Sequence, residues 1–218
     1  MFANVGLPPY KTLMSFFVTG TDTDVGKTVA SAWLMLHLGA DYYKPVQAGL
    51  ETTDRQTVKD ITALGDDRFH PCQYELEQPL SPHESARREN ITIDMGKFKL
   101  PQSDRPLVVE GAGGLMVPLN DEALVIDLIV QFDLPAILVV RSGLGTINHT
   151  LLSLEAMRKR NIKIAGIIMS GEKSPHNRHA LEQYGGGVPI IAEIDAFETV
   201  STQNLLAIKP EIDLRELI

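Results

Sequence analysis

Short apolar runs rich in β-branched residues recur along the chain, and each lies near a polar or glycine-containing turn. Continuous runs of this kind are typical of strands that are buried on both faces of a parallel sheet. The pattern predicts strands at residues 16–19, 42–46, 107–109, 136–140, 164–169 and 188–192.

Helical candidates occupy most of the segments between these runs, at residues 28–38, 54–64, 81–89, 125–132, 146–160 and 175–184. One helix start is well marked, because Ser81 is a capping residue, Pro82 suits the first helical position and Glu84 suits the third. Strand and helix alternate almost throughout the chain. This alternation predicts a three-layer, doubly wound α/β fold with a mostly parallel sheet, whose functional groups lie at the carboxyl ends of the strands.

Composition narrows the class of protein. With 218 residues and 44% hydrophobic content, the chain can bury a full core, and we expect one domain at 15–218 after a loose extension at 1–14. The net charge of −8 argues against nucleic acid and anionic membranes as partners, and no apolar run is long enough to span a bilayer. The single cysteine, Cys72, allows neither an intramolecular disulfide nor a thiolate metal cluster, which suits a cytoplasmic protein.

The first apolar run leads into a candidate phosphate-binding loop, GTDTDVGKT at 20–28. Backbone N–H groups at a helix start attract phosphate, Gly26 lets the main chain approach it, and Lys27 would neutralise the β/γ oxygens. Thr28 is placed to offer its hydroxyl to Mg²⁺. Five residues lie between Gly20 and Gly26, whereas the commonest phosphate loop has four. An ordinary strand–turn–helix with a solvated lysine is therefore the alternative. The flanking strand and helix favour a fold of the P-loop NTPase type.

A second strand ends in Glu110 and is followed by the small residues of 111–114. In phosphate-loop proteins, an acidic residue at the tip of a neighbouring strand usually holds or orients the metal ion. The alternative is a carboxylate that caps the turn. The small residues would let a ligand lie against bare backbone.

Lys44 stands at the end of another apolar run, and Pro45 favours an extended backbone there. A lone lysine is usually a solvated surface charge, but this one belongs to the same sheet edge as the phosphate loop. Asp54 could either cap the next helix or supply a second metal ligand, and spacing does not decide between these roles.

A third glycine-rich turn, at 142–145, precedes the helix expected at 146–160. A helix N-terminus attracts anions, and because this turn lacks a lysine it suits a carboxylate better than a triphosphate. A well-capped helix without a ligand is the alternative. His83, His149 and His179 share no metal-ligand spacing, so we interpret them as structural or solvated.

Five segments in matching order closely resemble the dethiobiotin synthetase family of biotin biosynthesis: GTDTDVGKT at 20–28, KPVQAG at 44–49, SPH at 81–83, VEGAGGLMVPL at 109–119 and LPAILVVRSGLGTINH at 134–149. The resemblance spans roughly residues 15–195, and the same extended phosphate loop is typical of that family. Several separate motifs in order are far more specific than any one of them.

The resemblance implies a homodimeric enzyme that converts 7,8-diaminononanoate, CO₂ and ATP into dethiobiotin, ADP and phosphate with Mg²⁺. It also implies the route: a carbamate forms on one amine, is phosphorylated by ATP, and is closed into a cyclic urea by the second amine. Elementary chemistry agrees, because a carbamate is a poor electrophile until its oxygen becomes a leaving group.

The resemblance further implies roles for individual residues. Lys27, Lys44 and Thr23 would be catalytic, with Lys27 on the β/γ phosphates and the other two beside the carbamate and the transferred phosphoryl group. Magnesium would be held by Thr28, Asp54 and Glu110. The nucleotide would also contact Asp24, Val25, Gly26, Val29, Gly111, Ala112, Gly113, Ser170, Gly171, Asp195, Ala196 and Phe197. The substrate would contact Thr23, Lys44 and Ala48, and its distal carboxylate would bind at Gly145, Thr146, Ile147 and Asn148 across the dimer interface.

Two positions depart from the family pattern. Ala48 stands where the family usually has a hydroxyl residue, so a polar contact to the substrate is lost or is replaced by Gln47 or water. Ser170 and Gly171 stand where some members carry asparagine and aspartate to read adenine. A serine hydroxyl lacks the paired donor and acceptor of an amide, so we expect looser base selectivity.

Two other functions share the phosphate loop. A nucleotide-driven switch or partitioning ATPase would use hydrolysis to change partners, and it would not require the small-molecule pocket that Lys44 and the helix start at 145–148 predict. A small-metabolite kinase would release its phosphorylated product instead of closing a ring.

Overall fold

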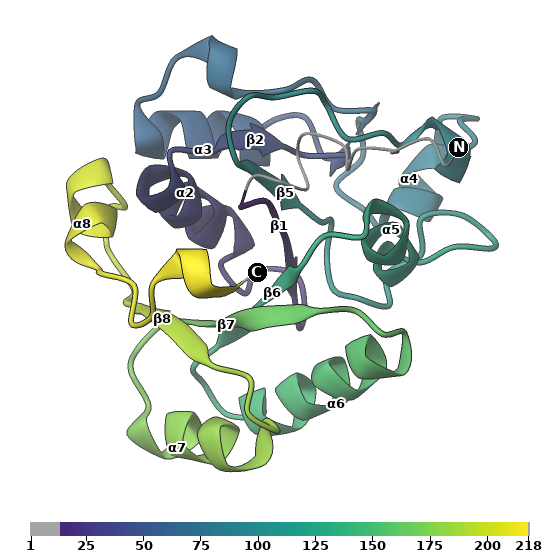
Figure 1. Ribbon diagram of the computed structural model, residues 1–218. Coiled ribbons are helices and arrows are strands. Elements are labelled where there is room, and N and C mark those ends of the chain that lie inside the picture. Colours follow the sequence, from purple (N-terminus) through teal and green to yellow (C-terminus); the bar gives the residue numbers. More distant parts are fainter. Residues whose placement is uncertain (1–13, 218) are drawn as a thin grey trace, which may run out of the picture.

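A parallel six-stranded sheet is the centre of the computed structural model, which describes residues 14–217 (Figure 1). Its strand order is β2-β5-β1-β6-β7-β8, with neighbours paired in parallel throughout. The bounds are β1 Phe16–Gly20, β2 Asp41–Tyr43, β5 Leu107–Glu110, β6 Ala136–Arg141, β7 Ile164–Ser170 and β8 Ile190–Ile194. Of the extension expected at 1–14, residues 1–13 lie outside the described part.

Helices cover both faces of this sheet, so the predicted three-layer α/β fold is confirmed (Figure 1). One face carries α2 Lys27–Leu38, α3 Asp54–Thr62, α8 Thr202–Ala207 and the short helix η3 Leu214–Leu217. The other carries α4 Pro82–Arg88, α5 Val125–Phe132, α6 Thr146–Lys159 and α7 Pro175–Tyr184. Two further short helices, η1 Asp66–Arg68 and η2 Met95–Lys97, lie in the connections.

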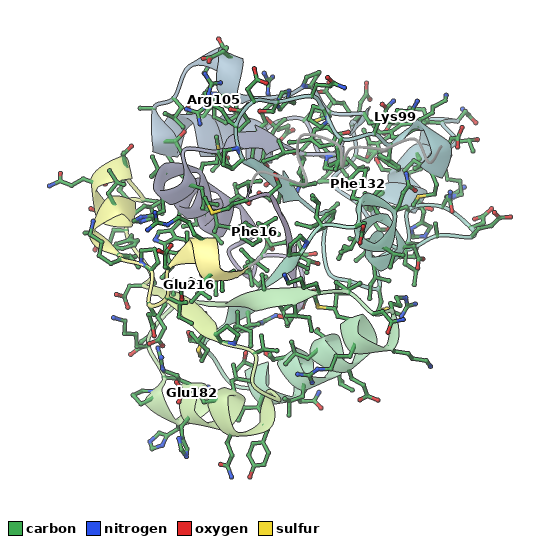
Figure 2. The ribbon with its side chains drawn as sticks, viewed as in Figure 1. Phe16, Lys99, Arg105, Phe132, Glu182 and Glu216 are labelled. Atoms are coloured by element: carbon green, nitrogen blue, oxygen red, sulfur yellow. The ribbon has the colours of Figure 1, made fainter. Side chains whose placement is uncertain are left out.

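Alternate residues of each strand supply two separate cores. In β1, Phe16 and Val18 pack with α2 and α3, whereas Phe17 packs with α5 on the other face. All three side chains are fully buried, as the uninterrupted apolar run predicts for a strand with helices on both sides. Figure 2 shows Phe16 in the middle of the molecule, with Arg105 and Glu182 at opposite ends.

The helix after the phosphate loop, α2, begins after a left-handed glycine and is tied at its middle to the carboxyl-terminal segment. Gly26 precedes α2 with φ of 93°, a left-handed conformation that favours glycine. Farther along α2, the Trp33 indole donates a hydrogen bond to the Ile208 carbonyl at 2.8 Å, and its ring lies 4.8 Å from that of His37. The phosphate loop and the segment after α8 are therefore both attached to helix α2.

The predicted strand at 42–46 is wrong, because the chain leaves the main sheet at Lys44 and Pro45. Proline has no backbone N–H to donate to a ladder, so the strand ends before it. The chain continues as β3 Val46–Ala48, which pairs in parallel with β4 Tyr74–Leu76 in a separate two-stranded sheet. This small sheet contributes part of the cavity wall described below.

The other predicted elements are present with small shifts at their ends. The helices at 125–132 and 175–184 have the predicted bounds, and the last strand begins and ends two residues later than predicted. Pro82 opens α4 as expected, but Glu84 pairs with Arg87 and Arg88 rather than with the helix start. Sequence patterns did not indicate β4 or α8. Within residues 14–217, no helix is both long enough and apolar enough to cross a membrane.

Candidate active site

The carboxyl ends of β1, β2 and β5 meet at a cavity of about 750 Å³. Each of these strands delivers one predicted segment: the phosphate loop after β1, Lys44 after β2 and Glu110 at the end of β5. Helix α3 and the small sheet close another side. The predicted residues that line this cavity are Thr23, Asp24, Gly26, Lys27, Thr28, Val29, Lys44, Ala48, Asp54, Glu110, Ala112 and Gly113. Val25 and Gly111 are buried beside them.

The phosphate loop is tightly folded around its lysine. Lys27 is a buried residue, and its ammonium donates to the backbone carbonyl of Asp22 at 2.8 Å. Burial, followed by the positive charge of Lys44, lowers the pKa of Lys27. An anion bound beside Lys27 would offset both effects. Thr23 and Asp24 are exposed at the mouth of the cavity.

Opposite charges meet at the centre of the site. The Lys44 ammonium lies 2.6 Å from Asp54 Oδ2 and 3.1 Å from Glu110 Oε1, and it donates to the Gly111 carbonyl at 3.0 Å. Lys44 and Glu110 are buried, whereas the Asp54 side chain is 32% exposed. The lysine is therefore an internal charge of the site and not the solvated surface charge that its residue type alone suggests.

The electrostatics of this cluster favour the charged forms of Lys44 and Asp54. Burial works against the charge of Lys44, but the carboxylates of Glu110 and Asp54 outweigh it and raise the pKa of Lys44. Burial likewise works against ionisation of Asp54, but the charge and hydrogen bond of Lys44 lower the pKa of Asp54. Each charge thus depends on its partner.

Three oxygen donors converge beside the phosphate loop. The Thr28 hydroxyl oxygen lies 2.9 Å from Asp54 Oδ1 and 3.1 Å from Glu110 Oε1. Two carboxylates and a hydroxyl suit Mg²⁺, which prefers oxygen and usually completes its shell with phosphate oxygens and water. Residues 14–217 contain no group of three or more His, Cys, Asp or Glu side chains placed to bind a metal. The donor set therefore suits a cation shared with a phosphate ligand.

Strand register explains why these groups meet. In the parallel pair β2–β5, Asp41 lies opposite Leu107 and Tyr43 lies opposite Val109. The next residue along each chain is Lys44 and Glu110, so the register brings these two together. Asp54 arrives from the first turn of α3, where Thr53 caps the helix by accepting from Gln56 N at 3.1 Å.

Gln47 binds the backbone of the first residue of α3. Its Oε1 accepts from Asp54 N at 3.1 Å, and its Nε2 donates to the carbonyls of Ala48 and Gly49 at 3.2 and 3.1 Å. These bonds engage both ends of the Gln47 amide with backbone groups at the edge of the cavity. Its contact with the start of α3 has no sequence signal, because the sequence pattern did not predict β3.

Tyr42 is a residue that the sequence did not single out. Its hydroxyl donates to Glu110 Oε2 at 3.1 Å. Burial, followed by the charge of Glu110, raises the pKa of Tyr42 well above its usual value. The available signal was its position two residues before Lys44, because the strand predicted at 42–46 would place both side chains on one face.

The predicted base-binding residues lie beyond the phosphate loop. The Ser170 side chain lies against Gly26, so closely that an added Cβ at Gly26 would collide with its hydroxyl. A second cavity, of about 550 Å³, is lined by Asp195 and Phe197 together with Lys173, Glu193 and Ile208 among others. Ala196 is exposed, and Gly171 has φ of 108° with open space around it.

The predicted carboxylate-binding turn does not line the 750 Å³ cavity of the same chain. Gly145, with φ of 90°, precedes α6, and Gly145 and Asn148 are exposed. Thr146 is buried, with its hydroxyl 3.5 Å from that of Thr150, and Ile147 is half-buried. The neighbouring Leu144 is fully exposed.

Comparison with known proteins agrees with this geometry. The protein-family profile described as AAA domain matches residues 14–204. The chain is 52% identical over 195 residues to the ATP-dependent dethiobiotin synthetase BioD of Paramagnetospirillum magneticum, covering 89% of this chain and 94% of the relative. It is 45% identical over 187 residues to the protein of the same name from Agrobacterium fabrum, covering 83% and 88%.

A solved structure supports the fold alone. The ParA family ATPase from Chlorobium tepidum TLS superposes with a TM-score of 0.53 over 89% of this chain and 90% of its own, at 13% identity. Identity at this level carries no information on activity. The sequence relatives do carry family membership, since they match over nearly their whole length, and the chain belongs to the dethiobiotin synthetase family.

Proposed function

We propose that this protein is an ATP-dependent dethiobiotin synthetase, a cyclo-ligase of biotin biosynthesis that forms carbon–nitrogen bonds. The observation that carries the proposal is the buried Lys44 ammonium, which lies between Asp54 and Glu110 directly beside the phosphate loop. A cation at this place can stabilise the negative charge of a phosphoryl group that moves from the nucleotide to a second substrate. A nucleotide switch does not require it.

The reaction converts a diamine into a cyclic urea. One amine of 7,8-diaminononanoate attacks CO₂ and loses a proton, which gives a carbamate. A carbamate oxygen attacks the γ-phosphorus of ATP, and ADP leaves. The second amine then attacks the carbamoyl carbon, loses a proton and expels phosphate, which closes the ring of dethiobiotin.

Residues of the cavity position these reactants. Lys27 binds the β and γ phosphates, and the phosphate-loop residues Asp24 to Val29, with Gly111 to Gly113, complete the nucleotide contacts. Lys44 and Thr23 orient the carbamate and the transferred phosphoryl group. Phosphoryl transfer depends chiefly on positioning and charge neutralisation, so fixed cations supply the main catalytic effect.

Thr28, Asp54 and Glu110 are the residues that would hold Mg²⁺, because their oxygens converge within 3.1 Å of the Thr28 hydroxyl. When bound, the cation supplies charge neutralisation at the phosphates. When no metal ion is bound, Lys44 neutralises the carboxylates of Asp54 and Glu110 and so stabilises the charged pocket.

The base of the nucleotide lies near Ser170, Gly171 and residues 195–197, on the side of the second cavity. Two exposed leucines support a homodimer: Leu144 in the turn before α6, and Leu152 on α6, which is 58% exposed. In this dimer the α6 start of one subunit binds the distal carboxylate of the substrate held by its partner. The cytoplasm, where ATP is supplied, is the proposed location.

Product analysis tests the function. Purified protein with Mg-ATP, bicarbonate and 7,8-diaminononanoate should yield a cyclic urea that mass spectrometry identifies against a dethiobiotin standard. Release of a phosphorylated carbamate without ring closure would indicate a kinase. ATP turnover that is unchanged by the diamine, with no new product, would reject the synthetase and favour a switch ATPase.

A further inference from the structure

Tyr42 is a polar residue in the core that the proposed chemistry does not use. Its side chain is fully buried, in the cluster between the sheet and helices α2 and α3. Tyr42 on β2 and Lys44, which directly follows β2, both reach the carboxylate of Glu110. On β5, Val108 lies opposite Tyr42 and Glu110 lies two residues farther along.

The tyrosine ring is held firmly in this position. It packs against Phe69, with ring centroids 5.9 Å apart, and the Tyr42 carbonyl accepts from His70 N at 2.9 Å. The hydroxyl at the end of this fixed ring reaches along the strand to Glu110 Oε2 at 3.1 Å. The direction of the contact is therefore set by the core and not by the site.

The two oxygens of Glu110 have separate partners. Oε2 accepts from the neutral Tyr42 hydroxyl, whereas Oε1 lies 3.1 Å from both the Thr28 hydroxyl and the Lys44 ammonium. Glu110 is 1% exposed, so bulk water cannot replace a lost donor at Oε2. A carboxylate held by one oxygen presents the other in a single orientation.

We propose that Tyr42 is a positioning residue for Glu110: its hydrogen bond to Oε2 fixes the carboxylate so that Oε1 faces Thr28 and Lys44, where the cation and phosphates bind. The inference rests on the proposed function only for the identity of the site. Partners of this kind, one step removed from a metal ligand, change metal affinity by roughly 10- to 100-fold when they are removed.

Tyr42→Phe tests the proposal, because it removes the hydroxyl and keeps the ring that packs against Phe69. The measurement is the affinity of a non-hydrolysable ATP analogue by calorimetry, in excess chelator and in saturating Mg²⁺. We expect the gain in affinity that Mg²⁺ provides to fall by about tenfold in the variant. Affinity in chelator should stay unchanged.

Tyr43→Phe is the matched control. Tyr43 is the next residue on β2 and is also buried, but it belongs to the core on the opposite face of the sheet. The variant loses the same hydroxyl group without touching Glu110, so the Mg²⁺-dependent gain should equal that of the wild type. Melting temperatures of both variants separate a loss of stability from a loss of cation binding.

A double-mutant cycle shows whether Tyr42 acts through Glu110. In a Glu110→Gln background, Tyr42→Phe should cause no further loss of the Mg²⁺-dependent gain, because the carboxylate that it positions is gone. An additional tenfold loss in that background would overturn the proposal. So would a Tyr42→Phe variant that melts earlier yet keeps the wild-type gain, since its role would then be structural.

These binding measurements do not depend on formation of dethiobiotin. If the wild type binds the analogue more tightly with Mg²⁺ but makes no cyclic urea, the proposed function fails while the Tyr42 inference is still tested. If Mg²⁺ gives the wild type no gain in affinity, the Tyr42 inference itself is overturned.

Discussion

In the proposed reaction Lys44 combines two tasks, since it pairs with the carboxylates of Asp54 and Glu110 and would stand beside the transferred phosphoryl group. We predict that Lys44→Gln lowers turnover by about 10²- to 10³-fold, well beyond its effect on nucleotide affinity, because the charge is needed most as the phosphoryl group moves. Comparison of kcat with the calorimetric Kd for ATP checks this. Equal losses in both quantities would make Lys44 a ground-state ligand.

The same substitution should also lower stability. Breaking a buried ion pair costs about 3 kcal/mol at the low end of the usual range, which applies here because Asp54 is 32% exposed. Denaturant unfolding measures this cost, and Mg²⁺ should recover part of it by neutralising Asp54 and Glu110. Lys59→Gln is a suitable control, because Lys59 pairs with the exposed Asp66 on the surface.

Single residues were predictable from sequence where a chemical type and a strand end coincide. Lys44 and Glu110 both follow apolar runs, and parallel strands bring such ends together. Tyr42 and Gln47 were not predictable. Their roles depend on where one hydroxyl and one amide point, and on burial that turns an ordinary polar side chain into a required partner.

At the scale of elements, the phosphate loop depends on a glycine that faces β7. We predict that Gly26→Ala abolishes measurable ATP binding, because φ of 93° disfavours a side chain and the new methyl group would collide with the Ser170 hydroxyl. Calorimetric titration with Mg-ATP provides the measurement.

Gly39→Ala is the matched variant at the other end of α2. Gly39 also has a positive φ, of 62°, but a Cβ there meets nothing within 4 Å. This variant should lose about 1 kcal/mol of stability and retain ATP binding. A Gly26→Ala protein that binds ATP normally would show that the phosphate loop tolerates a side chain at this position.

Elements with strong periodicity were predictable, and those defined by tertiary contacts were not. The helices at 125–132 and 175–184 match their predicted bounds. The strand predicted at 42–46 divides because Pro45 cannot extend the ladder, and the three-residue β4 is too short to show a pattern.

At the scale of the whole molecule, one buried aspartate joins segments that are distant in sequence. Asp41 on β2 accepts from Arg68 Nε at 2.7 Å and from Ser103 Oγ at 2.6 Å. Burial opposes its ionisation, but the hydrogen bonds from Ser103 and Arg68 lower the pKa of Asp41. Its folded-state pKa is thus below its unfolded value.

The sign of the pH effect follows from this shift. The stability that Asp41 contributes is fully present above about pH 4 and is lost as the pH falls through the lower folded-state pKa. Asp41→Asn should flatten the decline in unfolding free energy below pH 4 by up to about 1.4 kcal/mol per pH unit, the slope for one proton. The pH dependence of the unfolding free energy of Ser103→Ala should lie between those of the wild type and Asp41→Asn. Identical slopes below pH 4 in all three proteins would contradict the role of Asp41.

The proposed homodimer is a property of the whole molecule and can be tested by a substitution on α6. Leu152→Glu places a charge on the exposed face of α6, and we expect it to shift the proposed dimer towards monomer and to raise the KM for the diamine. Light scattering after size exclusion measures the mass. Tyr184→Glu is the control, because Tyr184 is similarly exposed, at 61%, but lies on α7. A wild-type protein that is monomeric at assay concentration would exclude the shared site.

The layer arrangement was predictable because alternation of strands and helices leaves few solutions, whereas the order β2-β5-β1-β6-β7-β8 depends on how each crossover packs. Phe16 and Phe17 show what sequence could supply, since two adjacent buried aromatics already require helices on both sides.

Trp33 is the only tryptophan of the chain, and it joins α2 to Ile208, a residue in the wall of the second cavity. Ultraviolet emission from this one indole therefore reports on the joint between the phosphate loop and the carboxyl-terminal segment. We expect nucleotide binding to change this emission, so that stopped-flow fluorescence can follow it in real time without any attached dye.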